Sequence, residues 1–216
     1  MKTFLDHIAV VAPDLASGAD YVERALGVRP QPGGAHPRMG THNLLMRLGE
    51  NVYLEVIAPD PDAQPPGRAR WFALDTIGPD TAPRLAAWVA RTDDIVAARA
   101  ACGAVPGEIE PMTRGALAWR ITIPVDGALP EGGAAPALIQ WDSAPHPASM
   151  LDDLGCTLRR LDVYHPEPSR VRRLLDALAF DGPVCVHGLP AGQALRLSAD
   201  IQTPHGPRSL PLAGVA

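Results

Sequence analysis

The strongest constraint on the fold of this chain is a short pattern that occurs three times along it. An apolar strand is followed by a proline or aspartate and then by a helix, with the three copies starting at Leu5, Leu85 and Leu158. Apolar residues at strand spacing and then at helical spacing define one strand–helix unit. The repetition of this unit predicts an α+β protein assembled from similar modules.

The first copy shows the predicted unit most completely. Residues 4–11 form a predicted strand, and Asp14 is placed to cap a helix over 15–26. Gly27 ends that helix, and a loop is expected at 30–34.

Two further strands are predicted in the first copy, at 41–48 and 52–58, joined by a tight turn. The strands at 4–11 and 52–58 have apolar residues on both faces, which indicates that both faces are covered.

Two ionisable residues lie within these apolar strands. Strand alternation places His7 on one face with Leu5 and Ala9, and Glu55 on one face with Tyr53. A buried carboxylate needs a proton, a cation or a metal, and His7 could help to hold one. The residues alone leave a hydrogen-bonded core histidine and a solvated or edge glutamate open as alternatives.

The amino-acid sequences of these strands resemble those of a known group of proteins. The segments "LDHIAVVAPDL", "GTHNLLMRLG" and "YLEVIAPD" resemble the vicinal oxygen chelate superfamily, and within it the glyoxalase-like domain proteins. That superfamily also holds extradiol dioxygenases, epimerases and fosfomycin-resistance proteins. The resemblance implies duplicated βαβββ modules whose curled mixed sheets cup a metal in a shared cleft. It also implies that His7 and Glu55 occupy two of the metal-ligand positions.

The repeats and the resemblance together divide the chain into four parts. We expect a first βαβββ module at 1–62, a connection at 63–83, a second βαβββ module at 84–143 and a C-terminal partial αβ module at 144–216.

Within the second module, strands are expected at 85–90, 114–123 and 136–141, and a helix is expected from Asp94 to Ala101.

The later modules depart from the ligand pattern of the first. Superposing the modules places Ala87 near the position of His7, and Gln140 opposite Glu55. The neutral amide of Gln140 is a weaker metal ligand than a carboxylate. In the C-terminal module, Arg160 and Asp200 fall at the matching places and predict a salt bridge in a structural extension.

Other polar residues are candidates for the cleft. His42 could be a third ligand, an acid–base group, a substrate contact or a histidine bonded to backbone at the strand entrance. Arg120 could bind a carboxylate or enediolate oxygen, or lie at the rim with its stem over apolar surface. His146 could fold back over the cleft, whereas His36 is expected in a solvated loop and Trp141 under the helices.

The resemblance implies a metal enzyme of the lyase, isomerase or dioxygenase type that acts on a small oxygen-rich substrate. A divalent ion (Zn, Ni, Mn or Fe(II)) would act as a Lewis acid. The candidate ligands are His7, Glu55 and Gln140, and the candidate catalytic residues are Glu55, His42 and Arg120. The alternative is a metal-free protein of the bleomycin-resistance type that binds and sequesters a small molecule.

Composition limits the remaining possibilities. A net charge of −5 with scattered arginines argues against nucleic-acid binding, and no apolar run is long enough to span a membrane. The three cysteines lack metal-site spacing and are expected to be reduced thiols of a cytoplasmic protein. Open edge strands favour further pairing, so we expect a homodimer.

Overall fold

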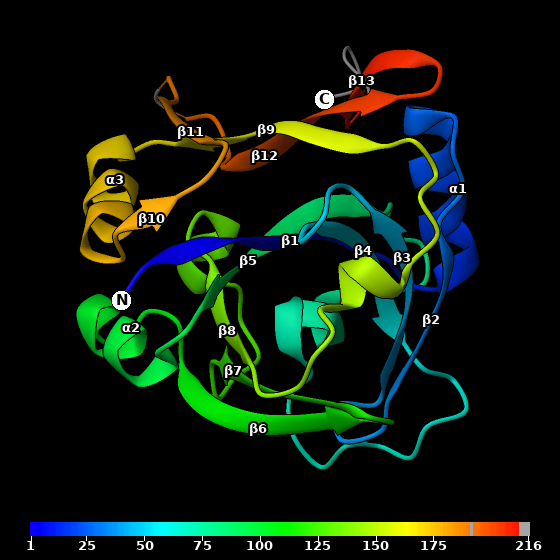
Figure 1. The fold of residues 1–216 in the computed structure, drawn as a ribbon, viewed down its shortest axis with the longest axis horizontal. Helices are drawn as coiled ribbons and strands as arrows, with labels where there is room; N and C mark the ends of the chain where they lie inside the picture. Colours follow the sequence, from blue (N-terminus) through cyan, green and yellow to red (C-terminus); the bar gives the residue numbers. More distant parts are fainter. Residues whose placement is uncertain (191, 212–216) are drawn as a thin grey trace.

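The architecture comes from a computed structural model that describes residues 1–190 and 192–211. The first eight strands and the short β10 form one curled mixed sheet, and four C-terminal strands form a second sheet beside it (Figure 1). The predicted α+β class with curled mixed sheets is confirmed.

Both N-terminal modules have the βαβββ order. The first consists of β1 (Thr3–Val11), α1 (Leu15–Leu26), β2 (Gln31–His36), β3 (Thr41–Arg47) and β4 (Tyr53–Pro59). The second consists of β5 (Arg84–Thr92), α2 (Ile95–Cys102), β6 (Glu108–Arg114), β7 (Leu117–Ile123) and β8 (Ala137–Trp141). The strand order β2-β3-β4-β1-β5-β8-β7-β6 places the two modules on either side of the β1–β5 pair.

The sequence prediction misses two strands of the N-terminal modules. A loop is expected at 30–34, but β2 begins at Gln31 despite its Pro-Gly-Gly segment, because it is an edge strand that pairs with β3 alone. The strand expected at 114–123 corresponds to β7, and β6 precedes it in a hairpin whose turn residue Gly115 has a φ of 57°.

The helix α1 forms as its sequence predicts. The Asp14 side chain accepts a hydrogen bond from the Ser17 backbone N–H at 2.8 Å, and Gly27 ends the helix with a φ of 72°. A Cβ atom at Gly18 would lie 2.4 Å from a methyl carbon of Val56, so the helix lies closer to β4 than any larger residue allows.

The C-terminal module contributes a sheet of its own. Its elements are β9 (Thr157–His165), α3 (Pro168–Ala177), β10 (Phe180–Asp181), β11 (Val184–Gly188), β12 (Arg196–Thr203) and β13 (Gly206–Leu210). The second sheet has the order β11-β9-β12-β13, while β10 pairs with β1. The predicted salt bridge forms, with 2.6 Å between Arg160 Nη2 and Asp200 Oδ2.

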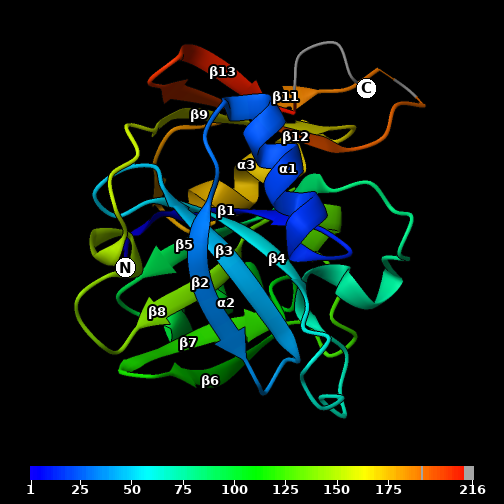
Figure 2. The same cartoon turned by 90° about the vertical axis from the view of Figure 1, so that its right-hand side faces the viewer.

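Two apolar cores separate the layers. The outer core lies between the curled sheet, the helices and the second sheet, and it includes Trp88, Leu161 and Leu197. The helix α1 contacts both β4 and β13, so it touches both sheets (Figure 2). The inner core fills the curl and includes Trp71 and Phe72 of the short 3-10 helix η1 (Trp71–Thr76). The connection between the modules therefore enters the space that the resemblance assigns to a cleft.

Two further observations bear on the sequence expectations. Within the described residues, no helix has both the length and the apolar character needed to cross a bilayer. Cys102, Cys156 and Cys185 are free thiols.

Candidate functional site

A β-bulge in β1 sets the geometry of the site. In the ladder between β1 and β5, Asp6 is the extra residue between Leu5 and His7. Leu5 and Ile8 therefore both lie in the outer core, and regular alternation fails between them. The bulge brings Asp6 and His7 to the same side of the sheet. The expectation that His7 shares a face with Leu5 is wrong for this reason.

Asp6 is a fully buried carboxylate with three donors. It accepts hydrogen bonds from His7 Nδ1 at 2.6 Å, Trp141 Nε1 at 2.9 Å and His146 Nε2 at 3.0 Å. Burial by itself raises the pKa of this carboxyl, but the hydrogen bonds and charges of His146 and His7 outweigh it and hold the pKa well below its usual range. Asp6 is therefore ionised, and it fixes the Nδ1–H form of the His7 ring.

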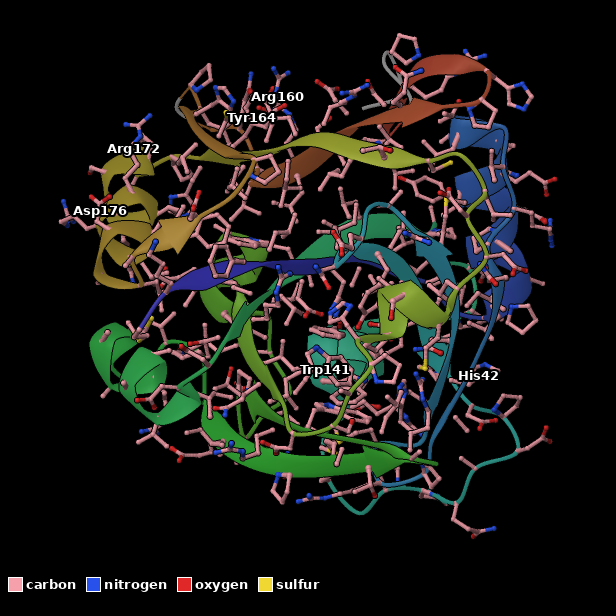
Figure 3. All side chains as sticks on the ribbon, in the orientation of Figure 1. His42, Trp141, Arg160, Tyr164, Arg172 and Asp176 are labelled. Atoms are coloured by element: carbon pink, nitrogen blue, oxygen red, sulfur yellow. The ribbon has the colours of Figure 1, made fainter. Side chains whose placement is uncertain are left out.

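His146 reaches this carboxylate from the segment after β8. The backbone N–H of Ala148 donates to His146 Nδ1 at 3.2 Å, so Nε2 carries the proton that is donated to Asp6. The fold-back of His146 over the cleft is thus observed. Trp141 donates to Asp6 in the interior of the curl, and it does not lie beneath the helices as expected (Figure 3).

Glu55 of β4 faces His7 across a short gap. His7 and Glu55 are 3% and 5% exposed, and Glu55 Oε2 lies 3.6 Å from His7 Nε2. That separation is too long for a direct hydrogen bond. The other oxygen, Glu55 Oε1, accepts from Asn43 Nδ2 at 2.6 Å. The structure therefore brings His7 and Glu55 together with a carboxylate oxygen and a ring nitrogen facing each other.

A polar network continues from Asn43 to the edge of the sheet. Asn43 Oδ1 accepts from the backbone N–H of Gly34 at 2.8 Å and from Arg114 Nη1 at 3.2 Å. Arg114 Nη1 also donates to His36 Nε2 at 3.1 Å, so His36 carries its proton on Nδ1, 3.2 Å from Thr41 Oγ1. Burial and the Arg114 charge lower the pKa of His36 to about 3, which keeps this ring neutral.

These groups surround a cavity of about 30 Å³, comparable to the volume of one water molecule. Tyr53 stacks on the His7 ring at a centroid distance of 4.5 Å, and burial raises the pKa of Tyr53 well above its usual value. Trp71 and Phe72 of η1 line the cavity on another side. Phe72 has a φ of 55°, a strained conformation for a bulky residue.

His42 and Arg120 lie elsewhere. His42 is on the face of β3 opposite Asn43, with its Nδ1 3.9 Å from Asp60 Oδ1, and it does not line the cavity (Figure 3). Arg120 points away from the curl, because its neighbours in β7 fill the inner core, and it forms hydrogen bonds to Asp142 at 2.7–3.3 Å. The prediction that both residues enter the cleft is corrected.

Gln140 also faces away from the cavity. Its Oε1 accepts from the backbone N–H of Ile95 at the start of α2, at 2.9 Å, while Trp141 and Ile139 line the cavity. The expected pairing of Gln140 with Glu55 fails because β8 is offset relative to the assumed alignment.

The strand registers show the correct match. Ala9 pairs with Glu55 in the first module, and Val89 pairs with Ala137 in the second. If Ala87 matches His7, Ala137 therefore matches Glu55. The second module supplies alanine at both positions.

The donor set does not fit the resident divalent metal that the resemblance implied. Metal sites in proteins use at least three protein ligands in the common zinc arrangements. Over residues 1–190 and 192–211, no group of three or more His, Cys, Asp or Glu side chains is arranged to hold a metal ion. His7 and Glu55 provide two donors, and the positive charge of Arg114 lines the same cavity and opposes a divalent cation.

Comparison with known proteins gives a consistent fold. The family model described as a glyoxalase-like domain matches residues 5–179. A hypothetical protein from Staphylococcus aureus has a similar structure, with a TM-score of 0.62, 16% identity, and coverage of 91% of this chain and 88% of that chain. No curated protein matches the chain.

Methylmalonyl-CoA epimerases give weaker structural matches. One, in complex with methylmalonyl-CoA and NH4+, has a TM-score of 0.43 and 15% identity, covering 68% of this chain and 98% of that chain. The enzyme from Mycobacterium tuberculosis has a TM-score of 0.41 and 17% identity, covering 65% and 88%.

Proposed function

Because the chain belongs to the glyoxalase-like domain family of the vicinal oxygen chelate superfamily, we propose that its curled sheet houses a proton-transfer centre for a small carbonyl compound. The observation that carries the proposal is the buried Asp6–His7–Glu55 arrangement, with 2.6 Å between Asp6 and His7 and 3.6 Å between His7 and Glu55. This function is of the isomerase type and needs no resident metal.

His7 has the features of a general base. Its Nδ1–H donates to a buried carboxylate, which orients the ring and stabilises the imidazolium that forms when Nε2 accepts a proton. Glu55 stands on the far side of the gap as the matching acid. A reacting carbon that lies to one side of the pair, about 3 Å from both Nε2 and Oε2, would be within reach of both groups.

The proposed reaction transfers one proton in each direction. A C–H bond next to the carbonyl breaks, its proton goes to His7 Nε2, and its electron pair moves onto the carbonyl oxygen. The protonated form of Glu55 then returns a proton to carbon, and transfer between His7 and Glu55 resets the pair. Arg114, held by Asn43 and His36, lies in the same cavity and supplies positive charge for the developing oxyanion.

The small cavity places a condition on this proposal. A volume of about 30 Å³ admits a water molecule but not a whole substrate. Trp71 and Phe72 of η1 form one wall, so binding requires η1 to shift out of the curl. Lids that close over substrate in this way also exclude water from the reaction.

Hydrogen–deuterium exchange at carbon tests the proposal without knowledge of the product. The protein is incubated in D2O with pyruvate, hydroxyacetone, dihydroxyacetone or methylmalonate in the presence of a chelator, and loss of the C–H signal is followed by NMR. We expect accelerated exchange of at least one compound, reduced by about 10²-fold or more in His7→Ala and in Glu55→Gln. Arg120→Gln, which alters a residue outside the cavity, is the matched control and should retain the rate.

Exchange that is insensitive to His7→Ala and Glu55→Gln would contradict the proposal by placing the chemistry elsewhere. A parallel incubation without the chelator tests for a metal, and exchange seen only in that incubation would also contradict the proposal. Binding of these compounds without any exchange would instead support the metal-free sequestering protein.

A further inference from the structure

A second and larger cavity lies where the first module, the second module and the C-terminal sheet meet. It has a volume of about 510 Å³, within the range of small-molecule pockets. Its lining comes from α1, from residues 82–86 around the start of β5, from the loop before β8 and from the C-terminal sheet. None of these residues lines the cavity around His7, so the two sites are separate.

The floor of the second cavity is apolar and well packed. Ala25 of α1, Leu85 of β5 and Leu197 of β12 are all buried in the outer core. Leu195 is partly buried against the same core, and Leu129 is partly buried against the inner core. Three different elements hold these side chains, so the floor is formed by the rigid part of the fold. It can accept an aliphatic or aromatic body of a ligand.

The rim of the cavity is positively charged. Arg24 and Arg84 line the rim, and both are exposed. Among the described residues, neither of these two arginines takes part in a salt bridge. Arg196 is engaged elsewhere, because its guanidinium carbon lies 4.2 Å from the centre of the Tyr164 ring. None of the described lining residues is an aspartate or glutamate. In a chain with a net charge of −5, this is a local reversal of sign.

We propose that the second cavity binds an amphipathic carboxylate. The carboxylate group pairs with Arg24 and Arg84 at the rim, and the apolar body lies against the leucines and alanines of the floor. Arginine suits this role because its planar guanidinium forms paired hydrogen bonds with a carboxylate. Tyr21 adds a phenol whose pKa is raised by burial, so it remains a neutral hydrogen-bonding group at the wall.

Calorimetric titration with three probes that share a ten-carbon chain tests both parts of the proposal. Decanoate, decanol and decyltrimethylammonium differ in charge. The two ionic probes are used below their critical micelle concentrations, and decanol is used below its solubility limit. We expect decanoate to bind at one site, decanol about tenfold more weakly, and the cation not at all. Added salt should weaken the binding of decanoate but not the binding of decanol.

Variants place the binding in this cavity. Arg24→Gln and Arg84→Gln should each weaken decanoate by about three- to tenfold, and the double variant should bind it no better than decanol. Ala82→Trp, at an exposed lining position, should block all three probes, with its thermal unfolding checked to show that the fold is intact. Arg159→Gln removes an exposed arginine outside the cavity and should leave decanoate binding unchanged.

Several results would overturn the proposal. Equal affinity for decanoate and decanol, or full affinity in the double arginine variant, would show that the rim charges do not select a carboxylate. Unchanged binding in folded Ala82→Trp would place the ligand elsewhere. The absence of decanoate binding to the native protein would remove the site.

Discussion

The two βαβββ modules both have a β-bulge in their first strand, but they differ in the side chains at the bulge. In β1 the bulge carries Asp6 and His7, and in β5 the matching irregularity leaves Ala86 as the extra residue before Ala87. Ala86 and Ala87 both lie in the inner core, as expected when a bulge turns two successive residues to one side.

This difference makes the site asymmetric. The first module supplies the titratable groups Asp6, His7 and Glu55, whereas the second supplies Arg114 and the aromatic walls Trp119 and Trp141. Two equal modules would offer two sets of metal donors. The two modules of this chain instead provide one set of acid–base groups and, in the same cavity, the guanidinium group of Arg114.

The largest difference in stability is expected between substitutions at the two bulges. Asp6→Ala leaves the donors of His7, Trp141 and His146 buried without their acceptor, and should cost about 3–5 kcal/mol of unfolding free energy. Ala86→Gly at the matching position removes one methyl group and adds chain entropy, and should cost about 1 kcal/mol. Urea unfolding measures both values, and equal losses would show that the Asp6 network contributes little to stability.

The edge strands of the two modules should differ in their response to pH. His36 at the end of β2 has a pKa of about 3 when folded and an ordinary value near 6.5 when unfolded, so the unfolded state binds more protons between these values. Its contribution is complete above pH 6.5 and is lost as the pH falls towards 3.

This loss should amount to about 2.5 kcal/mol between pH 6 and pH 4. Arg114 at the end of β6 remains charged throughout. The His36→Gln variant should show a shallower fall in unfolding free energy over that interval, and an unchanged slope would refute the neutral buried ring.

The amide found at the site, Asn43, and the amide expected there, Gln140, should behave differently. Asn43→Ala removes bonds to Glu55, Gly34 and Arg114, and should cost about 2 kcal/mol and alter the ring ¹⁵N shifts of His7. Gln140→Ala removes the bond to the first turn of α2 and should cost about 1 kcal/mol without changing those shifts. A change in the His7 ring ¹⁵N shifts of the Gln140 variant would show that Gln140 interacts with the site.

The smallest effect is expected at Arg120. Its salt bridge with Asp142 is partly exposed, so Arg120→Gln should change the unfolding free energy by less than about 1 kcal/mol. Arg114→Gln at the cavity should instead reduce carbon exchange strongly while Arg120→Gln preserves it. If Arg120→Gln reduced carbon exchange and Arg114→Gln preserved it, Arg120 rather than Arg114 would be the arginine that supports the reaction.

The sequence predicts α1 and three of the four strands of the first module, because their signals are local. Asp14 and Gly27 bound α1 as their chemistry requires. The apolar strand around Glu55 points to a buried carboxylate but leaves a solvated or edge position open, and the structure shows the side chain buried. Asp6 was missed because strict alternation assigns it to the face opposite His7, although two adjacent polar residues in an apolar strand are themselves a signal of a bulge.

Other parts of the site depend on contacts that no local pattern contains. Arg114 comes from an edge strand and reaches Asn43, 71 residues away in sequence. His42 and Gln140 are expected at the site, whereas the structure has Asn43 at the cavity and Ala137 at the position that matches Glu55, because only the assembled sheet fixes the strand registers. The filling of the curl by Trp71 likewise depends on tertiary packing.

The homodimer and the domain boundaries stay predictions. Light scattering at high concentration tests the first, and a monomer would contradict it. Limited proteolysis between residues 63 and 83 tests the second, since a connection should be cut before either module.

The most direct test of the account is a calorimetric titration of chelator-treated protein with Zn, Ni, Mn and Fe(II). His7 and Glu55 provide two donors for proton transfer, and the two matching positions of the second module are alanine. We therefore expect no binding tighter than about 1 mM for any of these ions. Binding at micromolar or lower Kd that disappears in both His7→Ala and Glu55→Gln would contradict the account and establish a metal centre.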